Sequence, residues 1–221
     1  KILREWTSDG LLINVQDIPP QTIELLREYE IPSVWINSKA EADCVHPDDL
    51  RAGEIATEHL LKLGHRRIVY LAYDSSHYSV VDRRRGYENA MQRVGLQSLS
   101  VSISSHPDHR SECIAACAQL LTDSSMPTAV ICHASYNALL LLHIATRQGL
   151  QVPDDLSIIT FGEYAEHVCG PHIATVILPL YEMGRNAVQM LCEKIAEPAL
   201  QLTPRALPVE VVEGETCAPP R

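Results

Sequence analysis

The sequence predicts an α/β protein built on parallel β-sheets. From Ile68 onward, short apolar runs alternate with longer segments whose apolar residues recur at helical spacing. A strand, a helix and a further strand in this order are typical of parallel strands joined by right-handed crossovers. The expected strands lie at 68–72, 99–103, 128–132 and 157–161. Their continuous apolar character indicates that helices cover both faces of the sheet.

The junction between the first of these strands and the helix before it is the clearest local signal. Gly64 follows the apolar stripe of that helix and suits the left-handed conformation that closes a helix. The basic residues 65–67 place positive charge where the helix dipole is negative. A buried strand then begins at Ile68. The stripe itself consists of Ala52, Ala56, Leu60 and Leu63.

The other elements follow from the same patterns. Upstream, the sequence predicts a helix end at 1–9, strands at 11–13 and 34–36, a helix from Pro19 to Tyr29, an edge strand at 44–46, and a helix capped by Asp48 or Asp49. Downstream, it predicts helices from about Asp82, at 135–148 and at 180–195, and a final strand at 207–212. The expected core-facing stripes are Tyr87, Ala90, Met91 and Val94; Ile114, Cys117, Ala118 and Leu121; and Leu180, Gly184, Ala187, Leu191 and Ile195.

Composition narrows the class of protein. Hydrophobic residues make up 46% of the 221 residues, but aromatic residues only 5%, so the core is expected to consist of aliphatic side chains. The net charge of −10 makes the chain a poor binder of polyanions, so this segment is not expected to hold DNA itself. No segment approaches the roughly 20 apolar residues of a membrane span.

The seven cysteines and the absence of common motifs exclude further classes. The cysteines follow no regular spacing and lie mostly in apolar runs, which favours buried, reduced thiols in a cytoplasmic protein. The sequence contains no P-loop, no dinucleotide-binding glycine motif and no nucleophile elbow. We therefore expect neither an enzyme nor a bound cofactor.

Polar side chains gather after the predicted strands. In open parallel sheets, ligands bind beyond the carboxyl ends of the strands, so these loops are expected to share one edge. Each of the four loops contains at least one histidine, which either marks a binding site or reflects a histidine-rich sequence with polar loops. The loop residues are Tyr73, Asp74, His77, Tyr78, Asp82 and Arg83; His106, Asp108 and His109; His133 and Ser135; and Glu163, Tyr164 and His167.

A metal site and a catalytic site are the two chemical alternatives to a binding site. His106, His109, Cys113 and Cys117 have spacings that suit one helical face, but Cys117 also belongs to the apolar stripe. Structural zinc sites use two short-spaced pairs separated by a loop, so a buried helix face is the favoured interpretation and no metal is expected. Ser135 beside His133 is only a pair of sequence neighbours and does not predict catalysis.

The Leu-Gly-His-Arg-Arg junction at 63–67 resembles the effector domain of LacI/GalR family transcriptional regulators, and the resemblance extends over almost the whole chain. It implies a periplasmic-binding-protein-like fold, in which two doubly wound parallel-sheet lobes enclose a cleft. The matching segments, in family order, are 9–13, 31–34, 51–53, 63–68, 83–87, 127–130, 152–159 and 182–187.

The resemblance also implies how the chain is organised. The first lobe would hold residues 1–64 and 177–199, without its first strands, and the second lobe 65–176 and 200–221. A helix-turn-helix domain would precede Lys1, so operator DNA would be bound outside this chain. A small polar effector, such as a sugar or related metabolite, would bind in the cleft of a cytoplasmic homodimer that has no membrane contact.

Pocket residues can be carried over from the family position by position. Arg83 stands three residues before Gly86-Tyr87, where the family has an arginine that grips effector hydroxyls or carboxylates. Its replacement is expected to weaken ligand binding and to change stability little. The alternative is a solvated arginine at a helix start. Asn14 and Asn37 follow first-lobe strands and would reach into the cleft, or would serve as turn residues. The expected ligand-binding set is Arg83, Asn14, Asn37, His77, His106, His133 and Glu163.

The chain departs from the family at two pocket positions. Ala134-Ser135 replace an Asn-Asp pair, and Gly162 replaces an aspartate that accepts hydrogen bonds from sugar hydroxyls, with Glu163 beside it. These changes predict a polar ligand other than a simple sugar, or a lost effector response. The alternative function is a periplasmic-type solute-binding protein, which the unpatterned cysteines disfavour, and a flavodoxin-like enzyme is disfavoured by the missing motifs.

Overall fold

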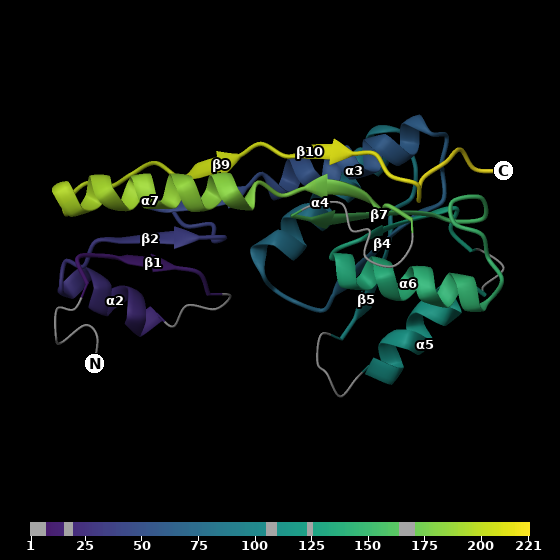
Figure 1. Ribbon diagram of the computed structural model, residues 1–221, viewed down its shortest axis with the longest axis horizontal. Helices are drawn as coiled ribbons and strands as arrows, with labels where there is room; N and C mark the ends of the chain where they lie inside the picture. Colours follow the sequence, from purple (N-terminus) through teal and green to yellow (C-terminus); the bar gives the residue numbers. More distant parts are fainter. Residues whose placement is uncertain (1–7, 16–19, 105–109, 123–125, 164–170) are drawn as a thin grey trace. The chain divides into compact units, whose positions relative to one another are not determined.

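The computed structural model describes residues 8–15, 20–104, 110–122, 126–163 and 171–221, and it confirms an α/β fold with parallel sheets. The chain divides into two compact units (Figure 1). Unit 1 comprises residues 1–48 and 179–208, and unit 2 comprises residues 49–178 and 209–221. The expected helix end at 1–9 lies largely outside the described residues.

The unit boundaries differ from those expected. Helix α3 (Asp49–Lys62) was expected in the first lobe, but its buried face packs in the core of unit 2. The predicted single strand at 207–212 is two strands, β9 (Arg205–Leu207) in unit 1 and β10 (Glu210–Val212) in unit 2. Pro208 lies between them and has no backbone N–H to continue a ladder.

Unit 1 is a parallel four-stranded sheet between two helices. The strand order is β1 (Leu11–Ile13), β2 (Ser33–Ile36), β3 (Cys44–Pro47) and β9. Helix α7 (Leu180–Ala196) covers one face and helix α2 (Pro20–Glu28) the other (Figure 1). Alternate strand residues serve the two faces: Val34 and Val45 pack with Met190 of α7, whereas Trp35 and Cys44 pack with Leu26 of α2. Strand β3 is therefore an interior strand, not the expected edge strand.

Unit 2 is a six-stranded sheet in the order β10, β8, β7, β6, β4, β5. Strands β4 (Ile68–Tyr73), β5 (Leu99–Ile103), β6 (Ala129–Cys132) and β7 (Ser157–Gly162) confirm the predicted parallel set. Strand β8 (Ala174–Ile177) pairs in parallel with β7 and was not predicted, although its residues form an apolar, β-branched run before Pro179. Strand β10 is antiparallel to β8.

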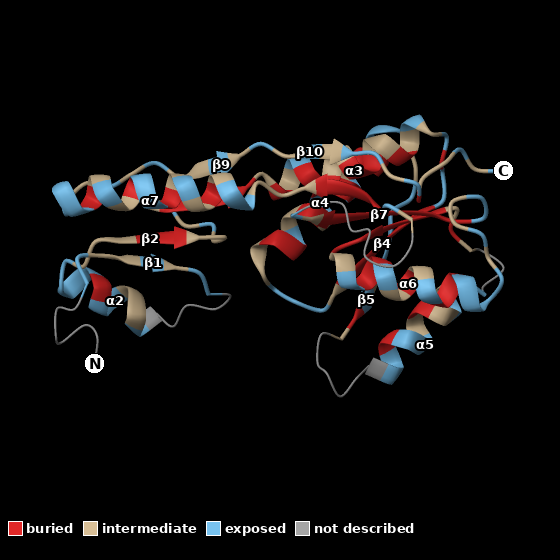
Figure 2. Cartoon of the chain, viewed as in Figure 1, coloured by how far each residue is buried: buried red, intermediate tan, exposed pale blue. Residues whose placement is uncertain are grey.

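Helices cover both faces of the unit 2 sheet. Helices α3 and α4 (Tyr78–Arg93) pack on one face, and α5 (Arg110–Leu120) and α6 (Ser135–Arg147) pack on the other. The inner strands β4, β6, β7 and β8 are almost entirely buried, whereas the outer strands β5 and β10 are largely exposed or partly exposed (Figure 2). No helix among the described residues is long and apolar enough to cross a membrane.

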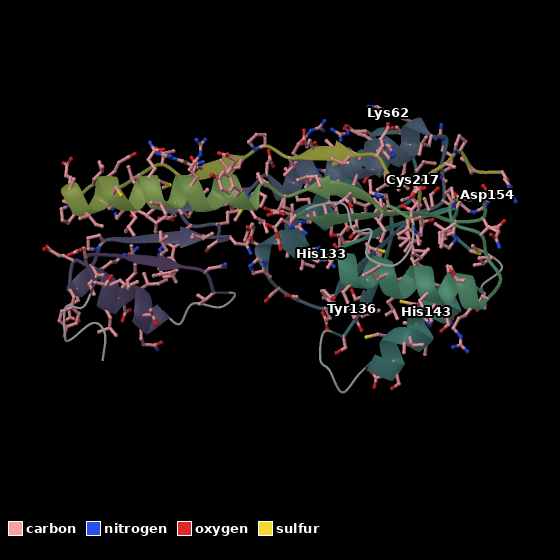
Figure 3. All side chains as sticks on the ribbon, in the orientation of Figure 1. Lys62, His133, Tyr136, His143, Asp154 and Cys217 are labelled. Carbon is pink, nitrogen blue, oxygen red and sulfur yellow. The ribbon has the colours of Figure 1, made fainter. Side chains whose placement is uncertain are left out.

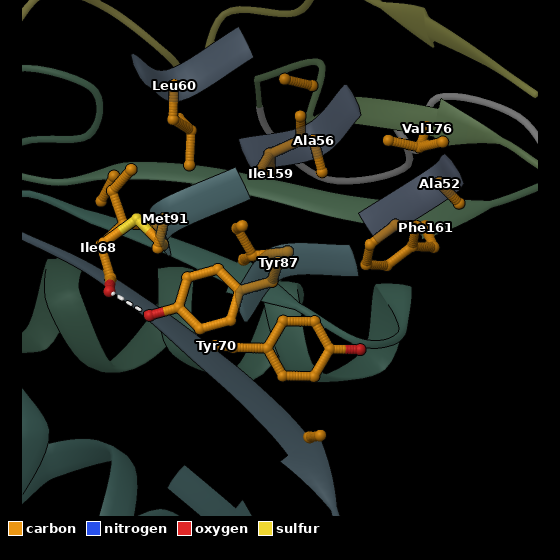
Figure 4. Close-up of a cluster of buried hydrophobic side chains, with 14 of the residues drawn as sticks. Ala52, Ala56, Leu60, Ile68, Tyr70, Tyr87, Met91, Ile159, Phe161 and Val176 are labelled. Atoms are coloured by element: carbon orange, nitrogen blue, oxygen red, sulfur yellow. Dashed lines mark hydrogen bonds between the residues drawn. The ribbon is translucent and has the colours of Figure 1, made fainter. Parts of the chain in front are cut away.

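Two tyrosines correct the expectation of a purely aliphatic core. Tyr70 and Tyr87 are fully buried and stack with their ring centroids 5.7 Å apart (Figure 4). The Tyr87 hydroxyl donates to the Ile68 carbonyl at 2.8 Å and accepts from the Leu99 amide at 2.8 Å. This side chain therefore fills the core and also ties the start of β4 to the start of β5.

The predicted end of α3 was correct, whereas the predicted start of α4 and parts of the buried faces of α5 and α7 were wrong. Gly64 has φ of +102°, as expected of a left-handed helix end. In α5, Cys113 is buried and Ile114 is exposed. In α7, Ile195 is exposed, and the buried residues include Met183, Met190 and Lys194. Helix α4 begins at Tyr78, one turn before the expected Asp82, because His77 caps it.

Helices α3 and α4 cross at two glycines. A Cβ added to Gly53 would lie 2.0 Å from the Arg83 carbonyl oxygen, and one added to Gly86 would lie 2.1 Å from the Leu50 carbonyl oxygen. No side chain fits at such distances, so the helix backbones can approach this closely only with glycine at both positions. The crossing fixes which residues of the two helices face each other.

The crossing predicts that Gly53→Ala destabilises the protein. The added methyl group must push α3 away from α4, which should lower the free energy of unfolding by roughly 1–3 kcal/mol or more. Gly184→Ala in α7 is the matched control, because a Cβ there meets nothing within 4 Å. That control should stabilise by roughly 0.5–1 kcal/mol through helix propensity. Urea denaturation measures both, and similar effects of the two substitutions would contradict the close crossing.

Candidate functional site

The crossing of α3 and α4 brings Asp49 and Arg83 together. Asp49 lies one turn before Gly53, and Arg83 lies three residues before Gly86, so the helix crossing places them opposite each other. Arg83 Nε donates to Asp49 Oδ1 at 2.6 Å. The side chains are 7% and 0% exposed, respectively. The pair is a buried ion pair between the first residue of α3 and the second turn of α4.

Arg83 makes two further contacts at the carboxyl ends of the strands. Its Nη1 donates to the backbone carbonyl of His133, just after β6, at 3.3 Å. Its guanidinium carbon lies 4.8 Å from the centroid of the Phe161 ring in β7, a cation–π arrangement. The alternative of a solvated arginine at a helix start is therefore wrong. The expectation that Arg83 contributes little to stability is also contradicted, since its removal would leave Asp49 buried without a counter-charge.

Asp49 has an unused acceptor. Within the described residues its Oδ2 is buried and has no hydrogen-bond partner. Tyr78, the first residue of α4, also hydrogen bonds to Asp49. Burial, followed by the negative charge of Asp49, raises the pKa of the Tyr78 phenol, so this hydroxyl is a donor. The carboxylate is thus held from two sides and retains one oxygen for another donor.

His133 is the second polar centre of this cluster (Figure 3). Its Nδ1 lies 2.9 Å from the Tyr70 hydroxyl, and its side chain is buried beside the rings of Tyr73 and Phe161. Burial, and then the nearby Arg83 and His77, lower the pKa of His133 to about 3. The imidazole is therefore neutral at physiological pH. Burial also raises the pKa of Tyr70, so its hydroxyl stays protonated and shares a hydrogen bond with His133 Nδ1.

The remaining predicted site residues lie in different parts of the structure. His77 accepts at Nδ1 from the Ser79 amide as the cap of α4, and its proximity lowers the pKa of His133. Glu163 follows β7 and is exposed. His106 lies outside the described residues. Asn14 and Asn37 belong to unit 1, where Asn37 has φ of +53° and its amide donates to Val45, as a turn residue does. A ligand contact by any of these five residues stays a prediction.

Local sequence patterns do not reveal the partners of Arg83 and His133 that define the cluster. Asp49 was identified only as a possible helix cap, and Tyr70 and Phe161 only as strand residues. A signal for Asp49 was present: Gly53 stands four residues after Asp49, and Gly86 stands three residues after Arg83. The sequence does not show, however, that these glycines meet.

The structure gives little support to the two chemical alternatives. Cys113 and Cys117 lie in the buried core of unit 2, and His106 and His109 lie outside the described residues. Among the described residues, no group of three potential ligands is placed to hold a metal ion. His133 Nδ1 pairs with Tyr70 instead of Ser135, so the structure provides no activated nucleophile at this position.

A separate cavity of about 890 Å³ lies in unit 1, at the amino ends of its strands. It is lined by the C-terminal parts of α2 and α7, including Leu26 and the Lys194–Asp43 ion pair, and by Trp35. The lysine also donates to the Leu200 carbonyl, so the pair ends α7 and holds the following loop. Ligands in open parallel sheets bind at the opposite, carboxyl ends, which favours the Arg83 cluster as the functional site.

The buried ion pair makes Arg83 a stability residue. Arg83→Ala should lower the free energy of unfolding by about 3–5 kcal/mol, because an unpaired carboxylate remains in the interior. Adding Asp49→Ala removes that charge, so the double variant should lose less than the sum of the two single losses. Arg85→Ala, at an exposed neighbouring position, should change stability by about 0.5 kcal/mol or less. Additive losses in urea denaturation would show that the pair is not coupled.

The lowered pKa of His133 predicts acid sensitivity. Between its folded value of about 3 and the usual 6.5, the unfolded chain binds a proton that the folded chain does not. Stability therefore falls as the pH is lowered through this window, by roughly 2 kcal/mol between about pH 7 and pH 5. Burial lowers the pKa of His59 and His65 as well, which acts in the same direction. His133→Gln should remove its share of the pH dependence in urea denaturation; an unchanged dependence would exclude a buried neutral imidazole.

Comparisons with known proteins agree with this fold. A family profile described as a periplasmic-binding-protein-like domain matches residues 57–217. The repressor CytR of Escherichia coli is 33% identical over 96% of this chain. The chain spans about two thirds of the length of the curated relatives that it matches, 64% in the case of CytR.

Solved structures show the same relationship. A LacI family transcriptional regulator from Mycobacterium smegmatis is 30% identical, with a TM-score of 0.81, over 100% of this chain and 82% of its own. A LacI family regulator from Enterococcus faecium, solved with bound ribose, shares the fold at a TM-score of 0.84 and 23% identity, over 99% of this chain and 82% of its own. The chain therefore belongs to the LacI family of transcriptional regulators and carries that family's periplasmic-binding-protein-like domain.

Proposed function

We propose that this chain is the effector-binding domain of a bacterial transcriptional regulator. The small polar effector binds at the carboxyl ends of the unit 2 strands, against Arg83 and His133. The observation that carries the proposal is the buried polar cluster at this edge, where Arg83, Asp49 and His133 converge in a domain of the LacI family. Parallel α/β sheets bind their ligands at this edge.

The chemistry of the cluster supports a hydrogen-bonded ligand. Arg83 supplies planar N–H donors, Asp49 Oδ2 supplies an acceptor, and the neutral imidazole of His133 supplies an N–H donor. Ribose is the molecule bound in the Enterococcus faecium regulator. This chain has Gly162 and Ala134-Ser135 at the family's other pocket positions. We therefore place the main ligand contacts on α3, α4 and His133.

The regulatory step follows from differential affinity. A ligand that binds one arrangement of the domain more tightly than another shifts the population toward it, and an attached DNA-binding domain responds. We propose that operator DNA is bound by a helix-turn-helix outside these 221 residues, in a homodimer in the cytoplasm. The net charge of −10 supports this division, because phosphate contacts dominate the affinity of proteins for DNA.

The alternative of a transporter's solute-binding protein has less support. CytR is a repressor, and the Mycobacterium smegmatis protein is a transcriptional regulator. The described thiols also include four buried free cysteines, which suits a reducing compartment better than an oxidising one. We propose no enzymatic reaction and no bound cofactor for this domain.

The proposal predicts that a small polar ligand stabilises the chain and that Arg83→Lys weakens its binding. A ligand at a hundredfold excess over its Kd should add about 2.7 kcal/mol of stability, which a thermal-shift screen of sugars and nucleosides detects. Arg83→Lys keeps the charge beside Asp49 but removes the planar donors, so affinity in calorimetric titration should fall about ten- to hundredfold.

Arg85→Lys is the matched control for this experiment. It makes the same chemical change at an exposed position two residues further along α4, and it should leave affinity unchanged. Equal affinity of the Arg83→Lys variant and the unaltered chain would remove Arg83 from the site. The regulatory part is tested with the full-length protein, whose affinity for operator DNA should change when the same ligand is added.

A further inference from the structure

The charge of Arg83 is already neutralised inside the protein. Its Nε lies 2.6 Å from Asp49 Oδ1, and the Asp49 side chain is fully buried. A surface ion pair would be screened by water, but a pair at this depth acts on any ligand beside it with little screening. An incoming anion would meet Arg83 and Asp49 together and would gain little net attraction.

The other titratable groups of the cluster add no net positive charge. His133 is neutral, because burial lowers its pKa to about 3. Tyr70 and Tyr78 are neutral as well, because burial raises the pKa of each phenol. Further out, the electrostatic neighbours of these two tyrosines include one cation, Arg84, and one anion, Asp82. The buried cation of the cluster, Arg83, is therefore compensated by Asp49 before a ligand arrives.

One carboxylate oxygen of Asp49 lacks a hydrogen-bond donor within the described part of the chain. Its Oδ2 is buried and has no partner among the described residues. A buried carboxylate oxygen without a donor costs about 1–3 kcal/mol or more, so a donor from water or from a ligand would relieve it. Arg83 and Tyr78 already serve the carboxylate from the protein side. A hydroxyl or amide N–H group of a ligand beside Arg83 would complete its coordination.

We infer that Asp49 determines the charge class of the ligand: the site selects an uncharged molecule that donates a hydrogen bond to Asp49, and it discriminates against phosphorylated and carboxylated ligands. This inference rests on the proposed function and adds to it. Arg83 then acts as a hydrogen-bond donor to ligand oxygen atoms, and Asp49 acts as the acceptor and as the charge that excludes anions.

The test compares matched neutral and anionic probes on the purified chain. The probes are ribose, glucose and adenosine, each beside its own 5- or 6-phosphate, together with glucose beside glucuronate. A thermal-shift screen identifies the pair that binds, and calorimetric titration gives both affinities. The neutral member should bind at least tenfold more tightly than its anionic counterpart. Tighter binding of the anionic member would overturn the inference and leave the proposed function intact.

Asp49→Asn tests the residue itself, since asparagine has almost the same shape but carries no charge. It exposes the charge of Arg83 to the ligand, so the ratio of neutral to anionic affinity should fall at least tenfold. Glu58→Gln is the matched control: it makes the same charge change on α3, also beside an arginine, but nine residues further along the helix. The helical rise puts it roughly 13 Å away. It should leave the ratio unchanged.

The outcomes separate the two claims. An Asp49→Asn variant that folds and keeps the ratio of the unaltered chain would show that Asp49 has only a structural role. If this variant does not fold, the comparison of neutral and anionic probes on the unaltered chain still decides the charge class. Binding of none of the probes would count against the proposed function itself, and the inference would fall with it.

Discussion

The close crossing of α3 and α4 is the constraint on which the candidate site depends. Gly53 and Gly86 allow the two backbones to meet where any side chain would collide with a carbonyl oxygen. The amino-terminal halves of the two helices then lie against each other, and a carboxylate from one helix reaches a guanidinium from the other. Asp49 and Arg83 are thus positioned by backbone packing, which is far stiffer than the rotamers of two long side chains. The site inherits this rigidity.

A buried ion pair is a costly way to stabilise a fold, because both ions lose their hydration. The same helix crossing filled by apolar side chains would be at least as stable. Its presence here is better explained by ligand recognition, which needs fixed donors and acceptors in a site of low dielectric constant. The surrounding residues suit this role: Phe161 covers the guanidinium, Tyr78 holds the carboxylate, and His133 supplies a carbonyl acceptor.

Much of the fold could be predicted from the sequence, because strands and helix ends are set by local pattern. The buried strands from Ile68 onward and the left-handed glycine at 64 are examples. The errors arose where local pattern competes with tertiary context. Ile114 and Ile195 are apolar but exposed. Lys194 is charged but buried, because Asp43 and the Leu200 carbonyl accept hydrogen bonds from its ammonium group. Similarly, the segment 207–212 has the pattern of a single strand, but Pro208 separates β9 from β10, which belong to two different sheets.

The site was predictable in its location but not in its electrostatics. His133 follows the end of β6, and Arg83 lies in the helix that follows β4, so topology alone places both residues at one edge of the sheet. The partner of Arg83 lies 34 positions away in sequence and is revealed only by the helix crossing. That partner changes the chemistry: an unpaired arginine would attract anions, whereas an arginine held by a carboxylate offers directional donors without net charge. Affinity must then come from hydrogen bonds and shape, which discriminate between ligands more finely than charge does.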